Sequence, residues 1–93
     1  MRTLKELLQI TLDNLDEYWG LNSFYGLCFV NGELFVNSII DDEECDLLNE
    51  YFISHARKSK YYKETGRGFI FEPKDKESRR AWLIEHIKLN SSM

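Results

Sequence analysis

The sequence predicts a mainly α-helical fold: a compact, small bundle of about four helices with one short extended aromatic segment at residues 69–71. Two capping boxes, at residues 3–6 and 41–44, each stand directly before an apolar run. The apolar residues recur at steps of three and four, which is the spacing of one helix face. Pro73 interrupts the chain before its last apolar run. With 93 residues, the chain has the size of a single domain covering residues 1–93.

The first predicted helix covers residues 3–19. Thr3 and Glu6 have the spacing of a capping box, in which each side chain binds the backbone amide of the other residue. Leucines follow at helical spacing, and Gly20 stands where a C-terminal cap belongs.

Residues 23–37 support two predictions. The pair Asn31-Gly32 lies between apolar runs and is a strong short-range signal for a β-hairpin, which would make the fold α+β. The same stretch keeps apolar residues at helical spacing, and a glycine inside a helix costs only about 1 kcal/mol relative to alanine. We prefer a helix over 23–37 and keep the hairpin as the alternative.

Two further helices are predicted over residues 42–57 and 76–89. The acidic run at 41–44 favours the first of them, because carboxylates stabilise the positive end of a helix dipole. Asp75 can cap the second, and its apolar residues recur at helical spacing.

The aromatic segment at 69–71 is predicted to be extended. The residue before Pro73 is pushed out of helical geometry, so a helix is not expected directly after the segment. Alternation along an extended chain directs Phe69 and Phe71 to the same side. We expect these two rings to plug the helical bundle and to hold the preceding basic loop against it.

The net charge of −4 conceals an uneven distribution. Residues 1–56 contain two basic and eleven acidic residues, a net charge of −9. Residues 57–93 contain ten basic and five acidic residues, a net charge of +5. Such asymmetry favours recognition by charge or head-to-tail self-association, so a homo-oligomer is one expectation. The alternative is that the two halves neutralise each other within the fold.

Several functional classes are disfavoured by composition. No apolar stretch reaches the roughly 18–20 residues that span a bilayer, and the N-terminus lacks the features of a signal peptide. We therefore expect a cytoplasmic protein without a membrane partner, in which Cys28 and Cys45 stay reduced. The spacing of the cysteines and histidines does not match a zinc site, and no catalytic set is evident. We predict no enzymatic activity, no cofactor and no metal.

Basic residues with interleaved aromatics in the second half form one candidate binding site. Basic side chains can hold phosphates while aromatic rings stack on bases, and a planar guanidinium can grip phosphate or carboxylate. The alternative is structural: a solvated loop and arginines paired with acidic residues of the fold. The candidate ligand-binding residues are Tyr61, Tyr62, Arg67, Arg79 and Arg80.

The acidic run in the first half is the other candidate. It does not match an EF-hand, because the alternating ligands and central glycine are absent. Its structural interpretation is a helix start. Its functional interpretation is part of an acidic face that docks on a basic partner. The candidate partner-binding residues are Asp41, Asp42, Glu43 and Glu44.

Three stretches of the chain resemble small, uncharacterised helical proteins encoded in tailed-phage genomes. They are GLC at 26–28, IIDDEECDLLNEYF at 39–52, and FIFEPKDKESRRAWLIEHI at 69–87. The likeness covers roughly residues 24–89. The resemblance implies a phage origin. Phage genes of this size commonly encode host-takeover or counter-defence proteins.

The chain departs from that pattern at three positions. Ile70 replaces a second aromatic residue, Lys74 replaces a glycine after the proline, and Ser78 replaces a proline before the arginines. Our leading hypothesis is a non-enzymatic phage protein that binds and inhibits a host protein through its charged surface. The alternative is a protein that binds and sequesters a nucleotide or another small anion. Duplex nucleic acid is disfavoured as a partner, because an acidic protein is repelled by the phosphates.

Overall fold

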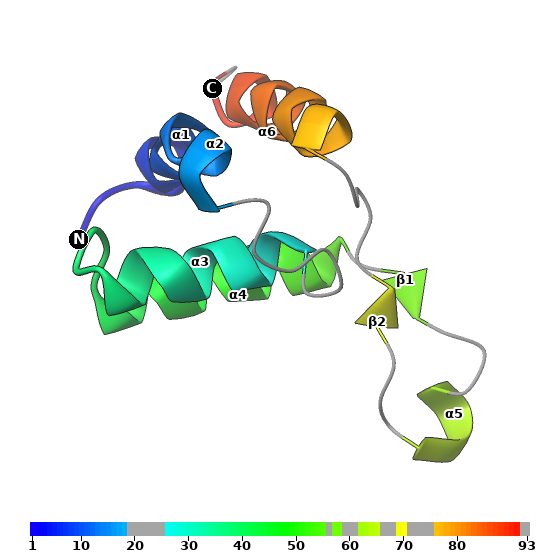
Figure 1. Cartoon of the computed structure of the whole chain (residues 1–93). Coiled ribbons are helices and arrows are strands. Elements are labelled where there is room, and N and C mark those ends of the chain that lie inside the picture. The colour runs from blue at the N-terminus through cyan, green and yellow to red at the C-terminus, as the bar shows by residue number, and fades with distance from the viewer. Residues whose placement is uncertain (19–25, 56, 59–61, 66–68, 71–75, 92–93) are drawn as a thin grey trace.

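The computed structural model describes residues 1–18, 26–55, 57–58, 62–65, 69–70 and 76–91 (Figure 1). These residues are mainly helical, which confirms the predicted fold class. The described helices are α1 (Leu4–Asp13), α2 (Leu15–Tyr18), α3 (Gly26–Val36), α4 (Asp42–Ser54), α5 (Tyr62–Thr65) and α6 (Lys76–Leu89). The described strands are β1 (Arg57–Lys58) and β2 (Phe69–Ile70), which pair in antiparallel orientation. The number of helices exceeds the predicted four, because α2 and α5 are additional four-residue turns.

The predicted helix 3–19 is divided into α1 and α2 at Asn14. The start is as predicted, since Thr3 and Glu6 form the complete capping box. At Asn14, both the backbone amide and the side-chain amide donate to the carbonyl of Ile10, over 3.2 and 2.9 Å. Asparagine side chains compete in this way with the regular helical bonds, which explains the interruption.

α3 shows that the hairpin alternative at Asn31-Gly32 is wrong. Asn31 lies inside the helix with no exposed surface, and its Nδ2 donates to Oδ1 of Asn49 on α4 over 3.0 Å. The amide therefore serves to join two helices instead of forming a turn. Gly32 is half-buried, and an added Cβ there would meet nothing within 4 Å.

The end of α3 is a Schellman motif built on Ser38. The φ angle of Ser38 is 61°, in the left-handed region that usually requires glycine. The amide of Ser38 donates to the carbonyl of Phe35 over 3.0 Å, and that of Ile39 donates to the carbonyl of Leu34 over 2.9 Å. These two bonds are the pair that defines the motif. They reverse the chain sharply, so that α4 can begin at Asp42.

α4 ends at Ser54, three residues earlier than the predicted 57, because Arg57 and Lys58 pair with β2 instead. The extended geometry predicted for 69–71 is present at Phe69–Ile70, while residue 71 lies outside the described residues. The expected plug by the phenylalanine rings concerns side chains outside the described part of the structure. α6 has the predicted bounds, 76–89.

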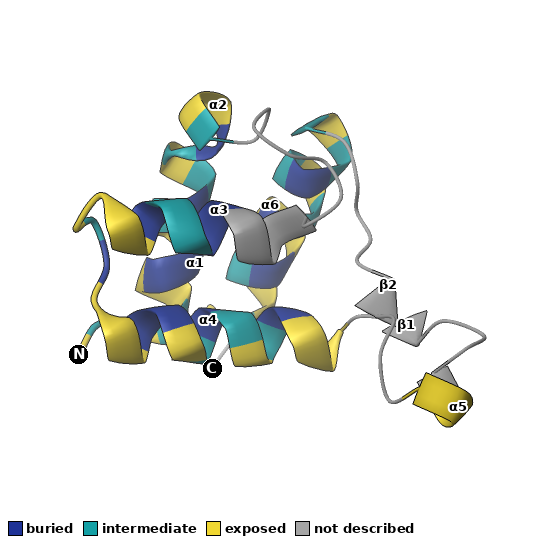
Figure 2. Cartoon of the chain, turned by 60° about the horizontal axis from the view of Figure 1, so that its bottom comes forward, coloured by how far each residue is buried: buried dark blue, intermediate teal, exposed yellow. Residues whose placement is uncertain are grey.

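The helices form two layers. α3 and α4 run side by side in one layer, while α1 and α6 lie together across it in the other (Figures 1 and 2). The buried faces of these helices meet between the layers (Figure 2). The core residues without exposed surface are Leu7, Leu8, Leu15, Val30, Leu34, Leu48, Phe52 and Leu83. This arrangement brings the N-terminus beside the turn between α3 and α4 (Figure 1).

Candidate functional site

An open groove lies at the turn between α3 and α4. Its volume is about 570 Å³. Apolar side chains come from the end of α3 and the turn, and acidic side chains come from the start of α4. The lining residues are Arg2, Phe35, Val36, Ser38, Ile39, Ile40, Asp41, Asp42 and Glu44. We refer to this feature as the α3–α4 groove.

Two large apolar side chains of the α3–α4 groove are exposed. Phe35 is 43% exposed and Val36 is 74% exposed, although both follow the buried Leu34 in the same helix. They are the last two residues of α3 and stand directly before the turn that contains the left-handed residue Ser38. Single exposed apolar residues are common, but adjacent ones lining a groove are typical of binding surfaces.

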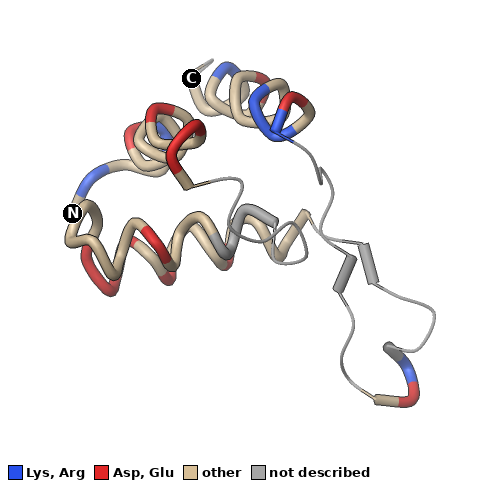
Figure 3. The backbone as a smooth tube through the Cα atoms, in the orientation of Figure 1, with Lys and Arg blue, Asp and Glu red and all other residues tan. Residues whose placement is uncertain are grey.

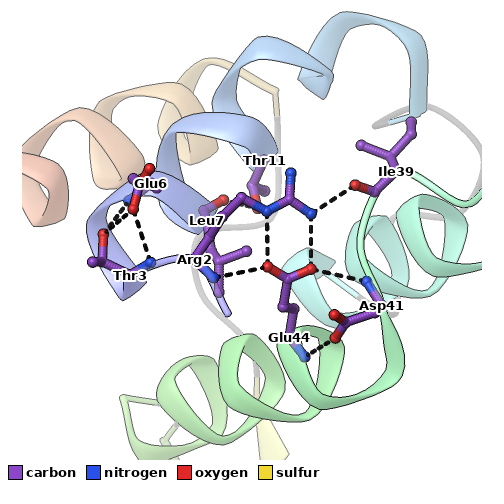
Figure 4. Close-up of polar contacts among 8 residues, drawn as sticks. All are labelled: Arg2, Thr3, Glu6, Leu7, Thr11, Ile39, Asp41 and Glu44. Atoms are coloured by element: carbon purple, nitrogen blue, oxygen red, sulfur yellow. Dashed lines mark hydrogen bonds and ion pairs between the residues drawn. The ribbon is translucent and has the colours of Figure 1, made fainter.

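Arg2 and Glu44, which both line the groove, form an ion pair (Figure 4). Nη2 of Arg2 lies 2.7 Å from Oε1 of Glu44, and Nε lies 2.8 Å from Oε2. The same Nη2 donates to the carbonyl oxygen of Ile39 over 2.9 Å. The guanidinium therefore ties the N-terminal segment both to α4 and to the turn.

Glu44 is almost completely buried, at 3% exposure, while Arg2 is 40% exposed. Hydrogen bonds from the Arg2 side chain, followed by the bond from the Asp41 amide, lower the pKa of Glu44 to about 2. The carboxylate of Glu44 also completes the capping box of α4, because it accepts from the Asp41 amide over 3.0 Å. Glu44 thus stays ionised and acts as the structural anchor of this end of the molecule.

The predicted partner-binding residues divide into two kinds. Glu44 faces Arg2 and is buried, whereas Asp41, Asp42 and Glu43 are exposed. Asp41 is the N-cap of α4 and accepts from the amide of Glu44 over 2.9 Å. Within the described part of the chain, Asp42 and Glu43 take part in no ion pair. Their charges therefore face the solvent, and Asp42 also lines the groove together with the exposed apolar side chains.

The predicted ligand-binding residues are only partly described. Tyr61 and Arg67 lie outside the described residues, and Tyr62 begins α5 with its side chain also outside them. Arg79 is on α6 with no exposed surface. Arg80, one position later, directs Nη2 to Oδ1 of Asp16 over 2.6 Å. Among the five, only these two neighbouring arginines can be placed relative to each other.

Asp16 joins the acidic and basic halves of the chain. Its Oδ1 contacts Nη2 of Arg80 and Nζ of Lys76, each over 2.6 Å. The hydrogen bond from Lys76 is the largest cause of the lowered pKa of Asp16. The two halves therefore neutralise each other in part, at the side of the molecule where α2 meets α6 (Figure 3). The exposed carboxylates at the start of α4 are not involved.

Sequence reasoning identified the acidic part of the α3–α4 groove but missed its other components. Phe35 and Val36 were counted only as members of a helix, and no pattern marked them as exposed. Arg2 lies 42 positions from Glu44, so nothing local in the sequence indicates their contact. The only available signal was the scarcity of basic residues in the first half, which contains Arg2, Lys5 and eleven acidic residues.

Other kinds of site receive little support from the described residues. No group of three or more metal-binding side chains comes together in them, and none of their helices is long and apolar enough to cross a bilayer. Burial raises the pKa of the Cys45 thiol, which keeps it protonated at neutral pH. Comparisons with protein-family models, curated proteins and solved structures found no match for this chain.

Proposed function

We propose that this chain is a non-enzymatic binding protein that docks a segment of another protein in the α3–α4 groove. The observation that carries the proposal is the position of Phe35 and Val36, which are exposed and line the groove together with Asp42. Within the described residues, the carboxylate of Asp42 forms no ion pair. The complementary segment carries apolar side chains between lysines or arginines. A segment of this composition matches both the apolar part and the acidic part of the groove.

The two parts of the groove have different roles in this proposal. Fully burying a valine or phenylalanine side chain contributes roughly 1.5–3 kcal/mol, so the apolar part supplies most of the affinity. The carboxylates attract a basic partner and align it, which mainly affects the association rate and its salt dependence. A groove of this size alone supports a small interface, as is typical of transient complexes.

The resemblance to phage-encoded proteins gives the proposal its biological setting. In that setting the partner is a protein of the infected bacterial host, and binding inhibits it in the host cytoplasm. The ion pair of Arg2 with Glu44 favours this role, because it fixes one side of the groove before a partner arrives. Preorganisation reduces the entropy lost on binding.

The test uses four variants and a bacterial host lysate. Val36→Ser and Phe35→Ser remove apolar surface from the groove, and Asp42→Asn removes a charge. Ile84→Ser is the matched control, because Ile84 is 40% exposed on α6, outside the groove lining. We expect the wild-type protein and the control to retain the same host protein, and Val36→Ser and Phe35→Ser to lose it. Asp42→Asn should retain less of it than the wild-type protein at low salt. Equal retention by all variants, or no specific retention, would overturn the proposal.

Two other outcomes are informative. Binding of nucleotides in calorimetry, abolished by Arg80→Ala but not by Val36→Ser, would favour the small-anion alternative instead. Concentration-dependent dimerisation that Val36→Ser prevents would identify a second copy of this chain as the occupant of the groove.

A further inference from the structure

Both histidines of the chain lie in one aromatic cluster between α4 and α6, away from the groove. The ring centroids of His55 and His86 are 4.8 Å apart, with the planes at 82°. Trp82 is stacked on His86 at 3.8 Å, and Tyr51 lies 5.6 Å from the His86 ring. We refer to these four residues, Tyr51, His55, Trp82 and His86, as the histidine cluster. No feature of the sequence indicated that the two histidines meet.

The hydrogen bonds of the cluster connect both imidazole rings to Tyr51. The amide Nδ2 of Asn90 donates to the hydroxyl oxygen of Tyr51 over 3.3 Å and to the carbonyl of His86 over 2.8 Å. When Nδ1 of His86 carries no proton, it accepts the hydroxyl proton of Tyr51 over 2.6 Å. In that arrangement neutral His86 carries its proton on Nε2. Nδ1 of His55 donates to the backbone carbonyl of Tyr51 over 2.8 Å.

Protonation of His86 conflicts with this arrangement. Nδ1 would become a donor, so the hydroxyl proton of Tyr51 would lose its acceptor. The new charge would lie in a site that is only 8% exposed, with the second imidazole of the cluster 4.8 Å away. Stacking on Trp82 would give some cation–π attraction in return.

Among the described residues, the charged groups around His86 do not compensate for this conflict. The titratable neighbours at the end of α4 are Tyr51 and His55. Glu85 on α6 raises the pKa of His86, but its effect is smaller than the lowering by burial and by His55. The titratable residues of α1, which also packs against α6, have exposed side chains: Lys5, Glu6 and Asp13. From α2, Asp16 contacts Lys76 and Arg80 in the first turns of α6.

We propose that the His55–His86 pair is an acid-sensitive latch that holds the C-terminal half of α6 against α4 at neutral pH and loosens it in mild acid. Burial, and to a lesser degree His55, lower the pKa of His86, so the folded state favours the neutral imidazole. The unfolded chain has an ordinary histidine pKa of about 6.5. The contribution of His86 to stability is therefore complete above about pH 6.5 and decreases as the pH falls below it.

The test measures global stability and local opening together. We expect the wild-type Tm to fall by on the order of 5 °C between pH 7.5 and 5.5. In hydrogen exchange corrected for the intrinsic pH dependence, we expect faster opening at pH 5.5 for residues 83–90 than for residues 30–36 of α3. The direct titration of the two imidazoles by NMR should place His86 below the ordinary value.

His55→Gln is the informative variant, because His55 is exposed and its replacement leaves the core intact. It removes the second imidazole, which lowers the pKa of His86, so the fall in Tm and the opening of α6 should both become smaller. His86→Gln should be less stable at pH 7.5 and should lose most of the pH response. A flat Tm, equal opening of α3 and α6, or an unchanged response in both variants would overturn the proposal.

Discussion

The ion pair of Arg2 with Glu44 gives the sharpest stability prediction. Glu44→Gln removes the charge, but the glutamine can still accept from the Asp41 amide, because capping boxes use glutamate or glutamine at this position. The variant therefore isolates the contact with Arg2. A hydrogen bond to a charged group typically contributes 1.5–3 kcal/mol, and breaking a fully buried pair costs 3–5 kcal/mol.

The exposure of the two partners sets the expected value. Glu44 is 3% exposed, but Arg2 is 40% exposed, so solvent screens the pair in part. We expect Glu44→Gln to lower the free energy of unfolding by about 2 kcal/mol. Urea unfolding followed by circular dichroism measures this quantity.

The other capping box provides a matched control. Glu6→Gln changes the same residue at the same position of α1, but Glu6 is exposed and its box is formed with Thr3. Glu6→Gln should lower the free energy of unfolding much less than Glu44→Gln does. Equal costs for the two variants would refute the assignment of the ion pair as the anchor of this end of the molecule.

The pH dependence of the same variant is a second readout. The pKa of Glu44 is lowered to about 2, so the ion pair contributes its full stability above the ordinary glutamate value of about 4.3. That contribution is lost as the pH falls from about 4.3 towards 2. Glu44→Gln should therefore lose less stability than the wild-type protein over this range. An identical acid-unfolding profile would contradict the reasoning.

Three further predictions concern the contacts that stabilise the helices. Asn31→Ala should lower the free energy of unfolding by about 2 kcal/mol, because it leaves the side chain of Asn49 without its buried partner; urea unfolding would show this, and a neutral effect would contradict it. Ser38→Gly should raise it by about 0.5–1 kcal/mol, since glycine adopts the left-handed conformation at no steric cost; a loss of stability would count against the Schellman motif. Asp16→Asn should leave the Tm almost unchanged, because Asp16 is 67% exposed and its partner Arg80 is 33% exposed. A marked fall in Tm would show that this ion cluster is a major support of α6.

The features of the fold that could be predicted from the sequence are those that depend on residues close to one another in the chain. Both capping boxes form as expected, because each depends on residues three positions apart. The bounds of α6 also match, since its start and its apolar spacing are encoded in one short stretch. Asn14 shows the limit of periodicity: the apolar pattern continues through it, while its side chain interrupts the helix.

The remaining features depend on contacts between distant residues. The signal at Asn31-Gly32 suits a hairpin locally, but burial of Asn31 against Asn49 favours a helix. The acidic run was predicted as part of a binding face. In the structure Glu44 is buried in an ion pair with Arg2, while Asp42 and Glu43 are exposed. These outcomes require the positions of the helices relative to one another. Periodicity and composition do not supply them.

The most direct test of the account is the affinity of the retained host protein for the wild-type chain and for Val36→Ser. Val36 is 74% exposed, so its replacement leaves the fold intact and changes only the surface of the α3–α4 groove. Loss of a buried valine contact predicts at least a tenfold weaker Kd for Val36→Ser, with Ile84→Ser unchanged. A Kd for Val36→Ser within twofold of the wild-type value would contradict the assignment of the groove as the binding surface.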